Sequence, residues 1–374
     1  GEKALIRQQM TILAIEGDFD AALPYANDFL ALDREDALAL NIVRVEAIKR
    51  EDWQTALSTL PLTSESRLDL IIEAIAYTAL LTGDGKLDEA LKSIEEGLDA
   101  IGFASLGNYA RGLVYATQGQ FQESSDSFAA FIGQDPFQYP RMAELTAYGL
   151  ERTGDTGNAR AIYEALLGTG ARQAGEEGLE RLDNDLPIPD TLLPRPTDIY
   201  TELLYVITRL LAEQDQYALA YRYAQEIGYL LTPQASLYPG YTEVIASSLL
   251  DLERYSEAEK FYQALEQVEE FRLAALLGQV QALSDQERYQ DALGALAEAE
   301  QVLGGAPGIN RQRGILYFRA EQYEDAVSSF DQWRAAVPEL GPAAAQPLFI
   351  AGISAYRLDD FEAMEEALLK SLEL

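Results

Sequence analysis

The 374-residue sequence contains no cysteine and no histidine. The chain therefore lacks the commonest zinc ligands, thiol nucleophiles and disulfides, together with the side chain most often used for proton transfer near neutral pH. A hydrolase of the Ser-His-Asp kind is excluded. Paired carboxylates such as Asp359 and Asp360 are adjacent, so they diverge on a helix instead of converging on one atom. We expect no catalytic residue, no metal site and no cofactor.

Basic residues are scarce. The sequence has 28 lysines and arginines against 62 aspartates and glutamates, which gives a formal net charge of −34. Binding of nucleic-acid phosphates needs a basic surface, so we expect no nucleic-acid partner. The charge favours a partner with basic character. It is equally typical of a protein adapted to a saline environment, and the sequence does not separate these two explanations.

Long hydrophobic runs are absent as well. Apolar residues make up 48% of the chain, which is enough for a large core, but no run of about 18 of them occurs. We therefore expect no membrane-spanning helix. The sequence leaves the oligomeric state open.

What the sequence does contain is an internal repeat of about 34 residues. Residues 17–22, 51–56, 85–90 and 119–124 share one pattern, in which a polar pair is followed by a large apolar residue, two polar residues and a small residue. In the first block the closing small residues recur at intervals of 34, 34, 34 and 35: Ala22, Ala56, Ala90, Ser124 and Ala159. In a second block they recur at intervals of 38, 34, 34 and 38: Ala220, Ala258, Ala292, Ala326 and Met364. This period predicts ten repeats in two blocks of five.

Each repeat has the apolar spacing of two amphipathic helices joined by a tight turn. A glycine in the first helix, as at Gly112, Gly314 and Gly352, would let the paired helices approach closely. Tyrosines such as Tyr217 and Tyr323 occupy the large apolar position of the pattern, so we expect them to pack between repeats. The predicted fold is an all-α, right-handed solenoid of about ten helix-turn-helix units.

The repeats divide the sequence into three segments. We predict an N-terminal array over 1–165 and a C-terminal array over 198–374. Residues 166–197 interrupt the pattern with a short helical piece from Gln173 to Leu182, followed by four prolines within ten residues. Proline fixes φ and removes an amide donor, so this last stretch is predicted to be an extended connection.

A unit of 34 residues with small and aromatic side chains at these offsets resembles the tetratricopeptide repeat family, over roughly 1–165 and 198–374. The sequence departs from the family pattern at Arg160, Glu259 and Glu365, where an apolar residue is usual. The family's lysine and asparagine clamp for a C-terminal carboxylate is not matched, because Asn41 has no lysine at the corresponding offset. The resemblance implies a curved stack whose first helices line a concave face suited to a peptide or a partner helix.

Arginine and tyrosine anchor interfaces more often than other residues do. By helical spacing, the candidate partner-binding residues on the first helices are Arg7, Asn41, Tyr109, Arg141, Tyr148, Arg152, Tyr205, Arg209, Arg311, Arg319, Tyr356 and Arg357. Five side chains form one helical stripe: Arg141, Glu144, Tyr148, Glu151 and Arg152. This stripe is interpreted either as a binding surface or as a solvated face with ion pairs between successive turns.

These observations predict a non-catalytic scaffold that binds a protein or peptide in its concave groove. The alternative is an accessory protein that handles a glycan or small molecule for an export or transport system. Two blocks around a proline-rich joint, the second opening with residues 202–205, also resemble alphaproteobacterial envelope-associated proteins of the same family. That resemblance implies a periplasmic or envelope location and a role in envelope assembly, with the cytoplasm as the alternative.

Overall fold

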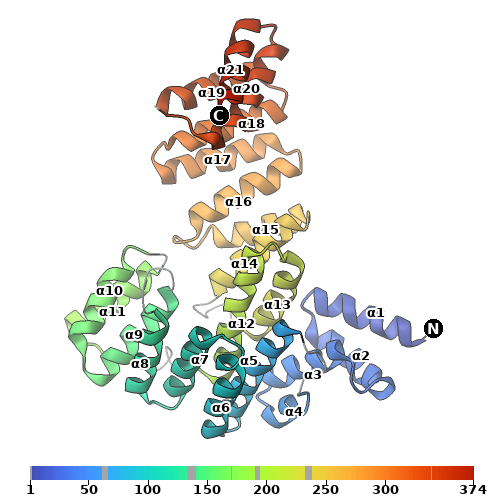
Figure 1. Cartoon of the computed structure of the whole chain (residues 1–374), viewed down its shortest axis with the longest axis vertical. Helices are drawn as coiled ribbons and strands as arrows, with labels where there is room; N and C mark the ends of the chain where they lie inside the picture. Colours follow the sequence, from blue (N-terminus) through green and yellow to red (C-terminus); the bar gives the residue numbers. More distant parts are fainter. Residues whose placement is uncertain are drawn as a thin grey trace. The chain divides into compact units, whose positions relative to one another are not determined.

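The structure is a computed structural model that describes residues 2–60, 66–132, 140–169, 171–189, 194–231, 238–337 and 339–374. Over these residues the chain is all-α and contains no β-strand (Figure 1). The prediction of an all-α solenoid of paired helices is confirmed. Within the same residues, no helix has the length and the apolar content needed to cross a membrane.

The chain divides into two compact units, residues 1–244 and residues 245–374. The first unit contains α1 (Glu2–Ile15), α2 (Phe19–Leu32), α3 (Ala37–Lys49), α4 (Trp53–Leu57), α5 (Arg67–Gly83), α6 (Leu87–Ser93) with the π-helical segment η1 (Ile94–Asp99), α7 (Ala104–Thr117), α8 (Phe121–Ile132), α9 (Pro140–Thr153), α10 (Thr156–Leu166), α11 (Arg172–Asn184), α12 (Pro196–Glu213) and α13 (Tyr217–Leu230). The boundary falls within α14 (Tyr238–Asp251). The second unit continues with α15 (Tyr255–Leu265), α16 (Arg272–Asp285), α17 (Tyr289–Leu303), α18 (Pro307–Arg319), α19 (Tyr323–Ala336), the short 3₁₀ helix η4 (Pro342–Ala344), α20 (Ala345–Arg357) and α21 (Phe361–Glu373).

Local sequence explains where these helices begin. The side chain of Asp18 accepts a hydrogen bond from the Ala21 amide at 3.0 Å at the start of α2, and Asp360 does the same for Ala363 at the start of α21. Such caps satisfy amide groups that have no partner within the helix. The turn before each second helix contains a residue with positive φ, which is a glycine at Gly119 and an acidic residue at Glu321. These local signals recur with the repeat and produce its helix-turn-helix form.

The paired helices pack as closely as the glycine positions predict. A Cβ atom added to Gly112 would lie 2.3 Å from the Phe128 ring, and one added to Gly314 would lie 2.8 Å from the Phe330 ring. The small residues that close the pattern in the second helices, among them Ala22 and Ala326, are fully buried. Small side chains therefore set the distance between the two helices of a repeat.

The segment that interrupts the repeats begins with one further helix. Helix α11 agrees with the helical piece predicted from Gln173 to Leu182, and it packs against α9 and α10. Residues 186–189 and 194–195 are not helical, as predicted for the proline-rich connection, whereas residues 190–193 lie outside the described part of the chain.

After the connection, the chain returns to the first array. Helix α12 packs against α5 and α7, and α13 contacts α1 and α3 (Figure 1). The sequence pattern places residues 198–244 with the second block of repeats, whereas packing places them in the first compact unit. Repeat spacing and tertiary packing thus divide the chain at different points, because the hairpin of α12 and α13 lies on the first helices of the preceding array.

Candidate functional site

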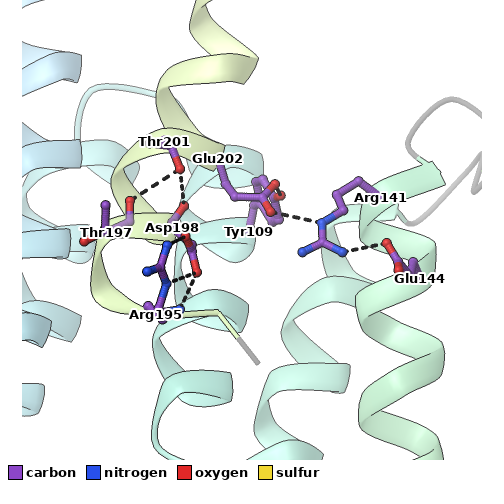
Figure 2. A network of polar contacts seen from close by, with 8 residues as sticks. All are labelled: Tyr109, Arg141, Glu144, Arg195, Thr197, Asp198, Thr201 and Glu202. Carbon is purple, nitrogen blue, oxygen red and sulfur yellow. Dashed lines mark hydrogen bonds and ion pairs between the residues drawn. The ribbon is translucent and has the colours of Figure 1, made fainter. Parts of the chain in front are cut away.

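A buried carboxylate on α12 joins this helix to the array (Figure 2). The Tyr109 hydroxyl on α7 donates to Glu202 Oε2 at 2.6 Å, and Arg141 Nε on α9 donates to Glu202 Oε1 at 3.0 Å. The other side of the guanidinium donates to Glu144 Oε2 at 2.6 Å. Glu202 is 4% exposed, so its charge is compensated by side chains of the array and hardly at all by solvent.

The electrostatics of this cluster follow from burial and charge. Burial raises the pKa of the Tyr109 hydroxyl, and the neighbouring Glu202 carboxylate raises it further, so the hydroxyl keeps its proton and remains a donor. For Arg141, burial lowers the pKa, but the Glu144 and Glu202 carboxylates outweigh burial and the net shift is upward. The cluster therefore consists of one arginine between two glutamate side chains, with a neutral tyrosine beside Glu202.

A second buried carboxylate, Glu226 on α13, joins the hairpin to α3 of the array. Asn41 Nδ2 on α3 donates to Glu226 Oε1 at 2.7 Å, and the Tyr200 hydroxyl on α12 donates to Glu226 Oε2 at 3.0 Å. Glu226 is 1% exposed. At the end of α13, the Tyr229 hydroxyl donates to Asp20 Oδ1 at 2.7 Å. Hydrogen bonds of Glu202, Glu226 and Tyr229 therefore join the hairpin to helices of the array.

The side chains of the predicted stripe on α9 contact other segments of the same chain. The Tyr148 hydroxyl donates to the Pro189 carbonyl at 3.3 Å, and Arg152 Nη2 approaches the Ile188 carbonyl at 3.4 Å. Arg181 of α11 forms an ion pair with Glu151 at 3.1 Å. The stripe therefore holds the start of the connection and α11, which neither of the two interpretations of this stripe foresaw.

The remaining candidates of the first unit lie at its surface or close to it. Arg7 forms an ion pair with Asp36 at 3.3 Å, and Arg209 forms one with Glu213 at 3.5 Å; both arginine side chains are more than half exposed. Tyr205 is half-buried, and burial raises its pKa to about 12 while the Arg209 guanidinium acts in the opposite sense. Of the eight candidates in this unit, Asn41, Tyr109 and Tyr148 are buried, so their side chains cannot meet a partner unless the unit opens.

In the second unit the candidates are more accessible. Tyr356 is 56% exposed, and its ring meets Phe361 edge-on with the centroids 6.4 Å apart. Arg357 lies 5.8 Å from the centroid of the Tyr323 ring. Arg319 donates to Asp285 Oδ1 at 2.8 Å on the preceding first helix, and Arg311 is half-buried on α18.

Sequence reasoning missed four residues that shape these surfaces. Glu202 and Glu226 were not among the candidates. For Glu202 there was a signal, because a lone carboxylate among the mostly apolar residues 199–204 indicates a paired buried charge. Leu277 and Phe349 were also missed, because an apolar residue in a helix is ordinarily assigned to the core. They are 41% and 51% exposed.

A comparison with known protein families finds a match for two stretches of the repeats. The family model described as tetratricopeptide repeat matches residues 109–176, which extend from the predicted N-terminal array into the segment that follows it, and residues 244–307 in the predicted C-terminal array. These are tetratricopeptide repeats. No curated protein matches the chain. Tetratricopeptide repeat proteins generally mediate protein–protein interactions, and the extended curved surfaces of such stacks suit that task.

Solved structures of tetratricopeptide repeat proteins are similar to the chain at low sequence identity. A fragment of MamA from Desulfovibrio magneticus is 18% identical, with a TM-score of 0.41, and the match covers 46% of this chain and 94% of that one. For yeast Tom70 the identity is 14% and the TM-score 0.35, with 100% of this chain and 85% of that one covered. For a tetratricopeptide repeat protein of Parabacteroides merdae the identity is 15% and the TM-score 0.31, with 75% and 98% covered.

Charge is unevenly distributed among the helices of the second unit. The first helices α16, α18 and α20 carry five arginines and one acidic residue: Arg272, Arg311, Arg313, Arg319, Arg357 and Asp285. The second helices α17, α19 and α21 carry ten acidic and two basic residues: Asp291, Glu298, Glu300, Glu324, Asp325, Asp331, Glu362, Glu365, Glu366, Glu373, Arg334 and Lys370. The first helices are thus the basic part of an otherwise acidic unit. Among the described residues, no group of three or more acidic side chains is arranged to hold a metal ion.

Proposed function

We propose that this chain is a non-catalytic interaction protein that binds a protein or peptide segment on the first-helix face of its second unit. We define this face by Leu277 on α16, Arg311 and Arg319 on α18, and Phe349 and Tyr356 on α20, continued by Arg357 next to Tyr356. The observation that carries the proposal is the exposure of large apolar side chains on first helices: Leu277 at 41% and Phe349 at 51% occupy matching repeat positions, and Tyr356 at 56% lies two helical turns after Phe349. Exposed apolar side chains that gather on one face are typical of interaction sites.

Repeat spacing and contacts both support treating these residues as one face. Leu277 precedes Arg311 by 34 residues, and Phe349 follows it by 38, which are the intervals of the repeat itself. The hydrogen bonds from Arg319 to Ser284 and Asp285 join corresponding positions of α16 and α18. Helix α18 also packs directly against α20. The first helices are therefore neighbours along this face.

The corresponding face of the first unit is occupied. Helices α12 and α13 lie against α3, α5 and α7. Glu202 accepts a hydrogen bond from Tyr109 on α7, and Glu226 accepts one from Asn41 on α3. Fully burying one large apolar side chain stabilises a complex by roughly 1.5–3 kcal/mol. On the second unit, Phe349 and Tyr356 are 51% and 56% exposed, so about half of this gain remains available from each.

The proposal also includes the place of action. We propose the periplasm or the envelope of a bacterial cell, with a role in envelope assembly, and the support for this is the resemblance of the sequence to envelope-associated repeat proteins. Fractionation of the native cell, followed by immunodetection of the chain, tests the location independently of any binding experiment.

Site-specific photo-crosslinking in the native cell tests the binding face. A benzophenone amino acid is placed at Phe349 or at Tyr356, and the matched control carries it at Leu32 on α2, which is 57% exposed and lies outside the proposed face. We expect covalent adducts with the same partner protein from residues 349 and 356 and none from residue 32. Adducts that arise only from residue 32, or no protein adduct at either face position, would contradict the proposal.

A further inference from the structure

The arginines of the first-helix face differ in how they are paired. Arg319 has a carboxylate partner within the chain, Asp285 at 2.8 Å. Within the described residues, Arg311 and Arg357 form no ion pair, although the chain has 62 acidic side chains. Arg357 lies over the Tyr323 ring, 5.8 Å from its centroid. Two guanidinium groups on one face thus remain available to carboxylates from outside the chain.

From this pairing, and resting on the proposed function, we infer that the segment bound on this face is acidic: it carries at least two carboxylates that flank a large apolar side chain. The carboxylates pair with Arg311 and Arg357, and the apolar side chain packs against Phe349 and Tyr356. This partner chemistry is the opposite of the basic partner that the net charge of the whole chain favours.

The pair of Asp285 and Arg319 shows the contact that such a partner would reproduce. Asp285, Arg319 and Arg357 occupy the same position in successive repeats, separated by 34 and 38 residues. Arg319 is neutralised by the carboxylate one repeat before it. In the next repeat the corresponding neighbour of Arg357 is Arg319, so this position supplies no carboxylate to Arg357 and its guanidinium group is open to a carboxylate from a partner.

The two guanidinium groups also set the spacing of the partner's carboxylates. Arg311 and Arg357 lie at repeat positions eight residues apart along a first helix, about 12 Å, and on adjacent helices whose axes are about 10 Å apart. An extended segment rises about 3.3 Å per residue. Carboxylates roughly five residues apart, with the apolar side chain between them, would reach both groups.

A basic segment would find its complement elsewhere on this unit. The second helices α17, α19 and α21 carry ten acidic residues, whereas the first helices carry one. A lysine placed near Arg311 or Arg357 would experience like-charge repulsion. Charge therefore favours an acidic partner at this face.

The test uses three fluorescein-labelled peptides of twelve residues in anisotropy titrations against the whole chain. All three carry the same central phenylalanine and leucine, and two positions five residues apart hold glutamate, glutamine or lysine. We expect the glutamate peptide to bind at least tenfold more tightly than the lysine peptide, with the glutamine peptide between them. In the double variant Arg311→Glu/Arg357→Glu the preference should reverse, and Phe349→Ser should weaken all three peptides.

Lys370→Glu on α21 is the control for the arginine variants, because it makes the same change of charge per site on a second helix. It should leave the order of the three peptides unchanged, and circular dichroism verifies that every variant is folded. Equal binding of the glutamate and lysine peptides, tighter binding of the lysine peptide, or no binding of the glutamate peptide overturns the inference. Crosslinks at residues 349 and 356 together with any of these results would leave the proposed function standing, whereas absence of those crosslinks would remove both.

Discussion

Single residues set how closely the helices of one repeat can pack. Gly314 lies against the Phe330 ring, which is fully buried and has no free space into which to move. Gly352 has the same relation to Leu368, whose side-chain atoms would lie 2.8 Å from an added Cβ atom. These repeats therefore need glycine at this position for the contact with their second helix, because a larger side chain would push the two helices apart.

We predict that Gly314→Ala lowers the free energy of unfolding of the second unit by about 1–3 kcal/mol, because the methyl group overlaps the Phe330 ring. The matched control is Gly294→Ala in the same unit, where an added Cβ atom meets nothing within 4 Å. That change should stabilise α17 by about 0.5–1 kcal/mol, since alanine is the better helix former. Urea unfolding monitored by circular dichroism measures both changes, and equal effects of the two variants would refute the steric argument.

At the scale of elements, the hairpin of α12 and α13 is held by carboxylates that it inserts among the first helices of the array. Glu202 meets Tyr109 and Arg141, whereas Glu226 meets Asn41. A buried carboxylate is tolerated only where donors replace its hydration, so these pairs fix the position of the hairpin more strictly than apolar packing alone would. The hairpin thereby occupies a surface that would otherwise be open to a partner.

Glu202→Gln should lower the free energy of unfolding of the first unit by about 2 kcal/mol, because Arg141 loses one of its two carboxylate partners in a site with little solvent. The control Glu213→Gln removes a carboxylate from the same helix whose pair with Arg209 is more than half exposed, and this should cost less than about 0.5 kcal/mol. Hydrogen exchange of the α12 amides in the whole chain should accelerate in the first variant alone. If both variants behave alike, the buried pair does not hold the hairpin.

For the whole molecule, the dominant electrostatic fact is a net charge of −34. Part of the acidity lies on the second helices of the second unit, where like charges recur in every repeat. Repulsion of this kind opposes the compact state. At 0.1 M salt, repulsion between exposed charges more than about 10 Å apart is largely screened. Surface ion pairs act in the opposite sense, since salt weakens them, but exposed pairs contribute little.

We therefore predict that the melting temperature rises by about 3 °C or more between roughly 20 mM and 0.5 M sodium chloride, as scanning calorimetry would show. The double variant Glu362→Gln/Glu365→Gln, which removes two exposed carboxylates from α21, should melt higher than the parent at low salt and rise less with added salt. A melting temperature that falls with salt would mean that ion pairs outweigh repulsion in this chain.

Much of the fold could be predicted because the repeat depends on the spacing of residues close together in the sequence. The glycines at Gly112 and Gly314, the buried alanines of the second helices and the helical piece near Gln173 all follow from patterns within one unit or between neighbours. The candidate site was less predictable. Helical spacing identified Arg319 and Tyr356 as first-helix residues, but it also selected Tyr109 and Tyr148, which are buried.

The sequence alone determined the helix-turn-helix unit, its period and the glycine contacts at Gly112, Gly314 and Gly352, because all of these depend on residues fewer than about 40 positions apart. Tertiary structure alone decided that residues 198–244 return to the first array, through pairs such as Tyr109 with Glu202 and Asn41 with Glu226 that are 93 and 185 residues apart. The position of such a return depends on small rotations that accumulate from one repeat to the next. No local pattern encodes that sum, so only the folded chain shows that the first array binds its own hairpin while the first-helix face of the second unit stays exposed.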